Sequence, residues 1–177
     1  MYTYKKIEFG FVVLCPERNF GGLRATIKTA KSNYPDATFV IVVPEITTQK
    51  EIADFQQFAP VVIGKDTYTS LINAGIKESL RDWNFIIFAG CSIRHRLYHK
   101  YAYFIEDEKD VMFPIAERKY SFVDGTLNGI LIHKNALKEV GDFAEGKVGI
   151  EEAKMFWALE AMDKGYKFKA LAGAKII

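Results

Sequence analysis

The chain has 177 residues, of which 49% are hydrophobic and 14% aromatic, enough apolar material for one sizeable core and so for a single domain. Its 24 basic and 22 acidic residues leave a net charge of +2, which favours neither nucleic acid nor an anionic membrane surface as a partner. No apolar run approaches the roughly 20 residues that span a bilayer, and the first residues lack a cleavable leader pattern, so we expect a soluble cytoplasmic protein.

The first half of the chain alternates short apolar runs with helical patterns, which is typical of βαβ units and a mostly parallel sheet. Gly and Pro separate the elements, and Thr47 or Thr48 is the expected cap of the second helix. We predict strands at residues 9–14, 38–43 and 61–64, a fourth apolar strand running from 85 to 92, and helices at 23–33, from 47 or 48 to 58, and 70–81.

The second half of the chain is less regular. A helical pattern from Ile93 to Glu106 begins with the basic run Arg94-His95-Arg96. We predict strands at residues 111–114 and 129–132, and helices at 135–140 and 151–164. No repeat or low-complexity segment divides this half from the first.

Ligands of open α/β sheets gather outside the carboxyl ends of the strands, so the residues that follow each apolar run are candidates for a site. Cys15 and Cys91 both end such runs, and we expect them to lie near each other, reduced and close to that site. Two cysteines are too few for a disulfide framework, and neither has the spacing of a zinc site.

Several familiar catalytic motifs are absent from the sequence. It has no Gly-x-Gly-x-x-Gly after the first strand, no P-loop and no Gly-x-Ser-x-Gly elbow. The histidines His95, His99 and His133 do not have metal-ligand spacing. These absences disfavour dinucleotide dehydrogenases, P-loop enzymes, serine hydrolases and metalloenzymes.

Five segments follow one another in an order that is typical of one large group of enzymes. They are residues 12–18 with the helix at 26–32, the strand at 36–43, Asn73-Ala74-Gly75-Ile76, residues 125–131 with 141–145, and Glu151-Glu152 ahead of Gly165-Tyr166-Lys167. In this order the chain resembles the nucleotide-sugar glycosyltransferases of the GT-A fold, and is closest to inverting family 2. The resemblance covers most of the chain and remains an analogy of fold until a site supports it.

The resemblance implies a GT-A-like three-layer sandwich of class α/β with a mostly parallel central sheet. Residues 1–177 would form one domain, with about 1–92 as the nucleotide-binding half and about 93–177 as the acceptor-side half. It also implies a nucleotide diphosphate sugar as donor and a hydroxyl group of a glycan, lipid or protein as acceptor, with a partner chain or a second copy as a further expectation. The implied donor-binding residues are Pro16, Glu17, Arg18, Glu45, Asn73, Gly90 and Cys91, and the acceptor-side residues are Asp124 and Asn128.

The chain departs from the family where members carry an Asp-x-Asp metal motif after the fourth strand. Ala89-Gly90-Cys91-Ser92 stands there, and none of these residues offers a carboxylate to Mn²⁺ or Mg²⁺. We therefore predict no metal ligands in the sequence, while a divalent metal, Mn²⁺ or Mg²⁺, stays open as a cofactor. In a metal-independent transfer we expect Arg94, His95 and Arg96 to neutralise the diphosphate. A solvated basic helix face is the alternative reading of this run.

The acidic pair Glu151-Glu152 carries the predicted catalysis, because an inverting transfer needs a base for the acceptor hydroxyl. Glu152 is the first candidate and Glu151 the second, although acidic residues also favour the first turn of any helix. Two other functions stay open. The chain is a GT-A-like domain that binds without turnover, or a nucleotidyltransferase, for which Gly21-Gly22-Leu23-Arg24 is a poor version of the expected loop.

Overall fold

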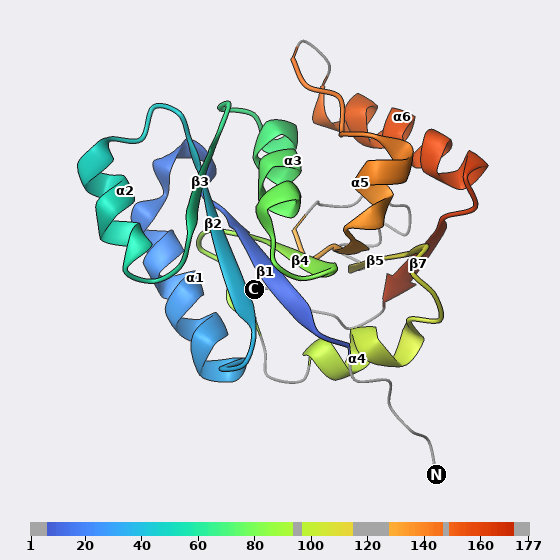
Figure 1. The fold of residues 1–177 in the computed structure, drawn as a ribbon, viewed down its shortest axis with the longest axis horizontal. Helices are drawn as coiled ribbons and strands as arrows, with labels where there is room; N and C mark the ends of the chain where they lie inside the picture. Colours follow the sequence, from blue (N-terminus) through green and yellow to red (C-terminus); the bar gives the residue numbers. More distant parts are fainter. Residues whose placement is uncertain (1–6, 94–96, 115–127, 147–148, 172–177) are drawn as a thin grey trace.

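A computed structural model describes residues 7–93, 97–114, 128–146 and 149–171. Within these ranges, seven strands join in a single sheet with the order β3-β2-β1-β4-β6-β5-β7 (Figure 1). Neighbouring strands pair in parallel except at β6, which runs antiparallel to β4 and to β5. The strands are β1 (Phe9–Leu14), β2 (Thr38–Pro44), β3 (Val61–Gly64), β4 (Trp83–Phe88), β5 (Asp110–Pro114), β6 (Leu131–His133) and β7 (Lys167–Leu171).

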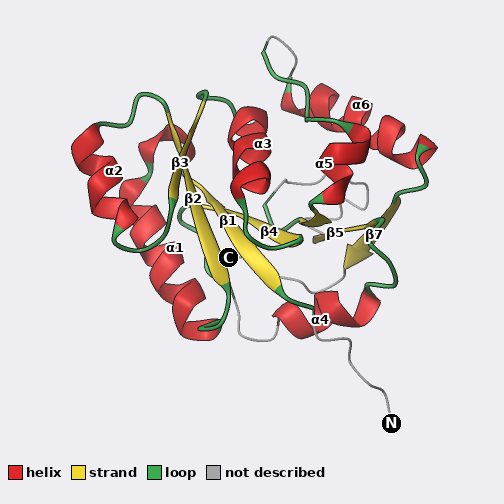
Figure 2. Cartoon of the chain, viewed as in Figure 1, coloured by secondary structure: helices red, strands yellow, loops and turns green. Residues whose placement is uncertain are grey.

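Helices cover both faces of the sheet, which gives three layers (Figure 2). Successive residues of a strand point to opposite faces, so Val13 packs with α1, α2 and α4 while Val12 packs with α3, α5 and α6. The helices are α1 (Phe20–Asn33), α2 (Gln49–Gln56), α3 (Tyr68–Glu78), α4 (Leu97–Phe104), α5 (Asn135–Val140) and α6 (Ile150–Asp163), with a short 3₁₀ turn at Pro16–Arg18. The predicted α/β sandwich with a mostly parallel sheet is confirmed.

The predicted elements of the first half are present, with shifts at their ends. The strand predicted at 85–92 is β4, whose end at Phe88 comes four residues earlier than predicted. Thr48 is the cap of α2, and its hydroxyl and the Glu51 carboxylate form a reciprocal capping box. The predicted end of this helix at residue 58 is wrong, since α2 ends at Gln56. The helix predicted at 70–81 is α3 and begins two residues earlier, because the Thr67 hydroxyl accepts a hydrogen bond from the amide of Ser70.

The second half differs from the prediction in two elements. The helix expected at 93–106 is described only over α4, and Ile93 lies in an isolated strand bridge. The strand β7 was not predicted, because its lysines interrupt the apolar pattern. It lies at the edge of the sheet and pairs in parallel with β5, so its polar residues remain exposed or half-buried. The strand expected at 129–132 is β6, two residues further along.

The helix α3 packs unusually close to the sheet. A Cβ atom added to Gly75 would lie 2.2 Å from Val12 Cγ1 and 2.8 Å from Val42 Cγ2. Both distances are too short for real carbon atoms, so the backbone of α3 rests on β1 and β2 only because residue 75 has no side chain. This close approach fixes the position of α3 against the strands that lead to the candidate site.

Candidate functional site

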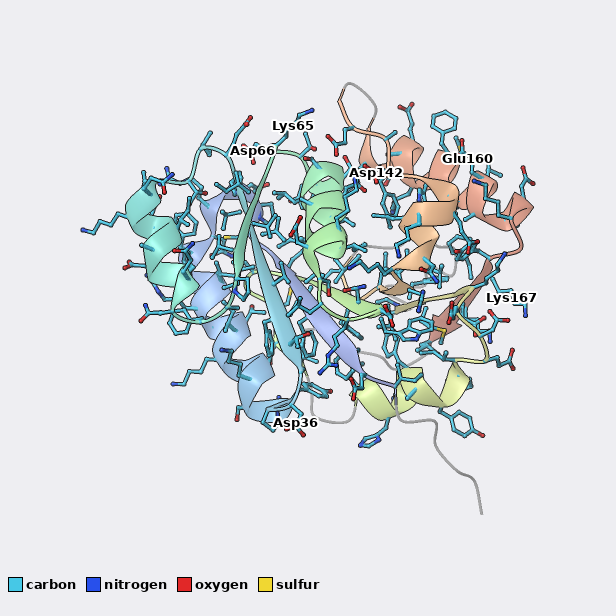
Figure 3. The ribbon with its side chains drawn as sticks, viewed as in Figure 1. Asp36, Lys65, Asp66, Asp142, Glu160 and Lys167 are labelled. Carbon is cyan, nitrogen blue, oxygen red and sulfur yellow. The ribbon has the colours of Figure 1, made fainter. Side chains whose placement is uncertain are left out.

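The parallel strands β1, β2, β3 and β4 have their carboxyl ends at one edge of the sheet. Ligands of open α/β sheets bind at this edge, so the site is expected there. Figure 3 shows Lys65 and Asp66, which follow β3, at this edge, whereas Asp36, which precedes β2, lies at the opposite edge. Pro16, Glu17 and Arg18 follow β1, and Glu45 follows β2 as an exposed residue. The structure therefore brings the predicted residues of the first half to one edge.

The turn after β1 has a strained backbone. Glu17 and Arg18 both have a φ of 55°, in the left-handed region that non-glycine residues rarely adopt. Their side chains point to different partners: the Tyr68 hydroxyl donates to Glu17 Oε1 over 3.4 Å, and Arg18 Nη2 lies 2.7 Å from Glu51 Oε1. Burial, with the Glu17 charge, raises the pKa of Tyr68, so this hydroxyl stays protonated at neutral pH.

The loop after β4 is held by side chains of α1 and its cap. Thr26, which is buried, donates from Oγ1 to the carbonyl of Cys91 over 2.8 Å and accepts from the amide of Gly90 over 3.0 Å. Asn19 Nδ2 donates to the carbonyl of Ala89 over 3.3 Å. Gly90 has a φ of 95°, which suits glycine. These contacts hold residues 89–91 in one conformation.

Asn128 fixes the same loop from the opposite side. Its Oδ1 accepts from the amide of Phe88 over 3.0 Å, and its Nδ2 donates to Cys91 Sγ over 3.0 Å. Because β6 runs against β4, the residues just before β6 lie beside the end of β4. Two residues that were assigned to different substrates, Asn128 to the acceptor and Cys91 to the donor, are therefore in direct contact.

The two cysteines differ in their surroundings. Both are free thiols, with Cys15 buried directly after β1 and Cys91 half-buried in the loop after β4. Burial raises the pKa of the Cys15 thiol to about 12, so it stays protonated at neutral pH and is a poor nucleophile. That the two thiols are neighbours stays a prediction.

Asn73, in α3, is buried and contacts a group of residues that includes Phe143, Glu145 and Lys65. It is 2% exposed. Its Nδ2 donates to the carbonyl of Phe143 and its Oδ1 accepts from the amide of Phe143. The Nδ2 also donates to Glu145 Oε1 over 3.0 Å. Glu145 Oε2 in turn lies 3.6 Å from Lys65 Nζ. The contact with the donor that the sequence assigned to Asn73 stays a prediction, because both polar atoms of its buried side chain already bond Phe143.

Sequence reasoning missed Lys65, Tyr68 and Glu145, which gather at this edge. The signal for Lys65 and Tyr68 was available, since both closely follow a predicted strand whose carboxyl end faces the site. Glu145 stood within a segment used for the family resemblance, but its partner Lys65 is 80 residues away in the sequence and no pattern along the chain links them.

The acidic pair lies at the amino-terminal end of α6. Glu151 and Glu152 are both exposed, and Glu152 Oε2 accepts a hydrogen bond from the amide of Gly149 over 3.3 Å. Glu152 is thus part of a capping arrangement that stabilises the start of the helix. Between these glutamates and the residues that follow β1 or β4, the described parts of the chain contain no hydrogen bond or ion pair.

Four predicted site residues, Arg94, His95, Arg96 and Asp124, lie outside the described residues. The described neighbours of the basic run are at the other end of the sheet. Asn33 Nδ2, at the end of α1, donates to the carbonyl of Ile93 over 2.7 Å, and Ile93 and Leu97 line a small hollow with Phe9 at the start of β1. Residues 89–93 therefore run back along α1, away from the end of β4.

Three hollows of the described surface lie away from the predicted site. One of about 320 Å³ lies at the amino edge of the sheet, lined among others by Phe9, Tyr34, Asp36 and the ion-paired Arg81. We prefer the carboxyl edge on chemical grounds, because the polar side chains that hold loop 89–91 converge there. Across the described ranges, no three His, Cys, Asp or Glu side chains are grouped so that they fit a metal ion. No described helix is long and apolar enough to cross a membrane.

Comparison with known proteins gives a structural likeness. No family model matches the chain, and no curated protein matches its sequence. The fold matches the crystal structure of S. aureus TarS 1–349 with a TM-score of 0.68 and 10% identity over 96% of this chain and 59% of that one. The same protein in complex with UDP-GlcNAc gives a TM-score of 0.65 at 11% identity over 96% and 57%.

TarS 1–349 in complex with UDP gives a TM-score of 0.60 at 11% identity, again over 96% of this chain and 59% of that one. The chain thus spans about three-fifths of the length of the TarS 1–349 chain that it matches. At this identity the likeness concerns the fold alone, and it confirms the GT-A-like architecture expected from the order of the five segments.

Proposed function

We propose that the chain binds a nucleotide diphosphate sugar across the carboxyl ends of β1, β2 and β4 and transfers the sugar to a hydroxyl acceptor. One observation carries the proposal: the loop after β4 is fixed by Asn19, Thr26 and Asn128, at the strand end where a ligand of this architecture is expected. The GT-A-like fold that the chain shares with TarS, which binds UDP-GlcNAc and UDP, supports it.

The nucleotide end of the donor would lie on the turn after β1. Pro16 shapes that turn, and Glu17, Arg18 and the exposed Glu45 offer polar groups to a base and a ribose. A strained backbone is costly, and such strain is retained mainly where it positions functional groups. The turn at Glu17 and Arg18 fits that description.

The diphosphate would lie over loop 89–91. The three amides of this loop are already used: Ala89 donates to Leu14, Gly90 to Thr26 and Cys91 to Phe88. Positive charge for the diphosphate must therefore come from side chains. We propose Lys65, which is 71% exposed at this edge. The role of Arg94, His95 and Arg96 stays a prediction, and the position of the preceding Ile93 at the other end of the sheet argues against it.

A divalent metal does not fit the described donor groups. Loop 89–91 has no carboxylate, and the Cys91 thiol already accepts a hydrogen bond from Asn128. The proposed transfer therefore uses no metal. In this proposal the chain is a relative of inverting family 2 in which the Asp-x-Asp motif has been replaced.

Glu152 is the proposed base and Glu151 the second candidate. The base takes the proton of the acceptor hydroxyl as its oxygen bonds to the anomeric carbon, while the bond from that carbon to the diphosphate breaks and its electron pair leaves with the phosphate. Exposure of both carboxylates at the start of α6 leaves them accessible to an acceptor. Asp124 and Asn128 belong to the acceptor side in this scheme, with Asn128 acting by shaping the loop.

A second candidate function is a GT-A-like module that binds a nucleotide sugar without turnover. The observation that favours it is loop 89–91, whose polar backbone groups are occupied and which brings no charged side chain to the diphosphate. Binding and transfer must therefore be measured separately.

Calorimetric titration with UDP and UDP-GlcNAc as probes, with Mn²⁺ or with EDTA, tests the proposal. We expect binding in EDTA that weakens about tenfold, or about 1.4 kcal/mol, in the Lys65→Ala variant. The Arg94→Ala/Arg96→Ala variant tests the predicted role of the basic run, which a loss of similar size would support. Lys50→Ala, at an exposed position of α2, is the matched control. Absence of binding by the unmodified protein rules out a transferase that uses these uridine nucleotides. Strict dependence on Mn²⁺ rules out the metal-independent scheme. Binding with no release of UDP from UDP-GlcNAc when a hydroxyl acceptor is present favours the second function.

A further inference from the structure

The outward face of α6 carries large apolar side chains that are exposed in the structure. Met155, Phe156, Leu159 and Met162 are 38%, 51%, 55% and 59% exposed, respectively. Met155, Leu159 and Met162 follow the spacing i, i+4, i+7 and so lie along one side of the helix, with Phe156 one turn before Leu159. The opposite side, which includes Trp157, packs into the core.

The same face is acidic. Glu151, Glu152, Glu160 and Asp163 are exposed on α6, and Figure 3 shows Glu160 among the side chains at the outer contour of the molecule. The lysine inside this helix, Lys154, is buried at 3% exposure and adds no exposed cation to this face. A helix face that only contacts water has no use for several large apolar side chains, whereas an apolar patch bordered by charged groups is typical of an interaction surface.

We propose that this acidic, apolar face of α6 is a docking surface for an amphipathic helix of another polypeptide that carries Lys or Arg beside its apolar stripe. An apolar ridge at this spacing packs well against the groove of a second helix. Methionine side chains adapt to the partner surface, and the bordering carboxylates pair with its cations.

Charge disfavours the other occupants of this surface. A second copy of the chain placed with α6 against α6 would bring two sets of the same four carboxylates together, which costs free energy through like-charge repulsion. An anionic membrane surface would be repelled by the same groups. A partner with basic residues is the occupant that both the apolar and the charged side chains accommodate. The face includes Glu151 and Glu152, the candidate bases, so the variants that test docking are placed at the other end of α6, at Leu159, Glu160 and Asp163.

The test uses two fluorescent model peptides, an amphipathic leucine–lysine helix and its leucine–glutamate counterpart, with binding followed by fluorescence anisotropy. We expect the lysine peptide to bind and the glutamate peptide not to bind. Leu159→Glu removes an apolar contact from the face and should weaken binding at least about tenfold. Leu80→Glu, at a residue 79% exposed after α3, is the matched control and should bind as the unmodified protein does.

A charge reversal, Glu160→Lys/Asp163→Lys, should weaken the lysine peptide and allow the glutamate peptide to bind. Equal binding of both peptides, or a Leu159→Glu variant that binds normally, overturns the proposal. Sedimentation velocity provides a further check: a dimer of the unmodified protein that Leu159→Glu converts to monomer assigns the face to a second copy and also overturns it. Circular dichroism of each variant confirms that the fold is retained.

Discussion

The side chain of Asn73 pairs with the backbone of Phe143 as one strand residue pairs with another. Asn73 Nδ2 donates to the Phe143 carbonyl over 2.8 Å, and Asn73 Oδ1 accepts from the Phe143 amide over 3.0 Å. Both residues are buried, at 2% and 1% exposure. This pair joins α3 to the segment that leads into α6. Asn73 also donates to Glu145, and Glu145 lies beside Lys65 at the candidate site.

Replacing Asn73 by Ala is expected to destabilise the fold by about 2–3 kcal/mol, because it leaves a buried amide and a buried carbonyl of Phe143 without partners. Urea denaturation measures the change in the free energy of unfolding. Gln56→Ala, at an exposed position of α2, should remain within about 0.5 kcal/mol of the unmodified protein. Equal stability of the two variants would show that the pair contributes nothing.

Gly75→Ala tests the close approach of α3 to the sheet. The added methyl group would overlap Val12 and Val42, and we expect a loss of about 1–3 kcal/mol in the free energy of unfolding, since the strands cannot move aside without disturbing the core. Gly21→Ala is the matched substitution, because nothing lies within 4 Å of its added carbon, and it should stabilise α1 slightly. A neutral Gly75→Ala would mean that α3 lies further from β1.

Thr26→Val keeps the shape of the side chain and removes both hydrogen bonds to loop 89–91. If the loop positions the diphosphate, the affinity for UDP-GlcNAc should fall about tenfold in calorimetry. Thr26→Ser retains the hydroxyl and should restore binding, which separates positioning from a general loss of packing. Loss of affinity in both variants alike would argue against a role for the hydroxyl.

Glu152→Gln separates the helix cap from the proposed base. The amide oxygen of Gln still accepts the hydrogen bond from Gly149, so the stability should not change by more than about 0.5 kcal/mol. Turnover should fall by about 100-fold or more, since the amide cannot take a proton, while affinity for the donor is kept. Glu151→Gln is the control with near-normal turnover. Should Glu151→Gln lose activity instead, the two roles are reversed.

His133 makes the stability depend on pH. Burial lowers its pKa below the ordinary value of 6.5, against the opposing effect of Glu108, and its Nδ1 accepts a hydrogen bond from the amide of Asn135. Because the unfolded chain binds the proton more tightly, stability should be full above pH 6.5, fall as the pH decreases, and level off below the lowered pKa.

The measurement is the free energy of unfolding at a series of pH values from about 7.5 to about 5. His133→Asn keeps an acceptor for Asn135 and should reduce the loss of stability on acidification, whereas His99→Gln, at an exposed residue of α4, should not. An unchanged pH profile in His133→Asn would contradict this assignment.

The sequence predicted the first four strands well because each is a short apolar run bounded by turn residues, as in Val61–Gly64. It predicted the start of α2 because the cap and its partner, Thr48 and Glu51, lie three residues apart. The strand β7 was not predicted, because Lys167 and Lys169 are polar and interrupt its apolar pattern. The ion pair of Lys169 with the buried Asp110, which makes this lysine acceptable in a strand, joins residues 59 positions apart.

The candidate site was predictable in position more than in contacts. Residues that follow strands, such as Glu17 and Glu45, could be placed at the carboxyl edge from the alternation of elements alone. The contact of Asn128 with Cys91 could not, because it depends on the reversed direction of β6. The direction of residues 89–93 along α1 was equally hidden, since it is set by Thr26 and Asn33 rather than by any local pattern.

The place of β4 between β1 and β6 has a consequence for synthesis of the chain on the ribosome. Once β1 and β4 have emerged and paired, the other edge of β4 has no partner until residues 131–133 follow. That edge is Trp-Asn-Phe-Ile-Ile-Phe, an uncharged apolar segment of the kind that pairs with other chains. An unpaired apolar edge of this kind favours pairing with other chains, so the risk of aggregation rises between the emergence of β4 and that of β6.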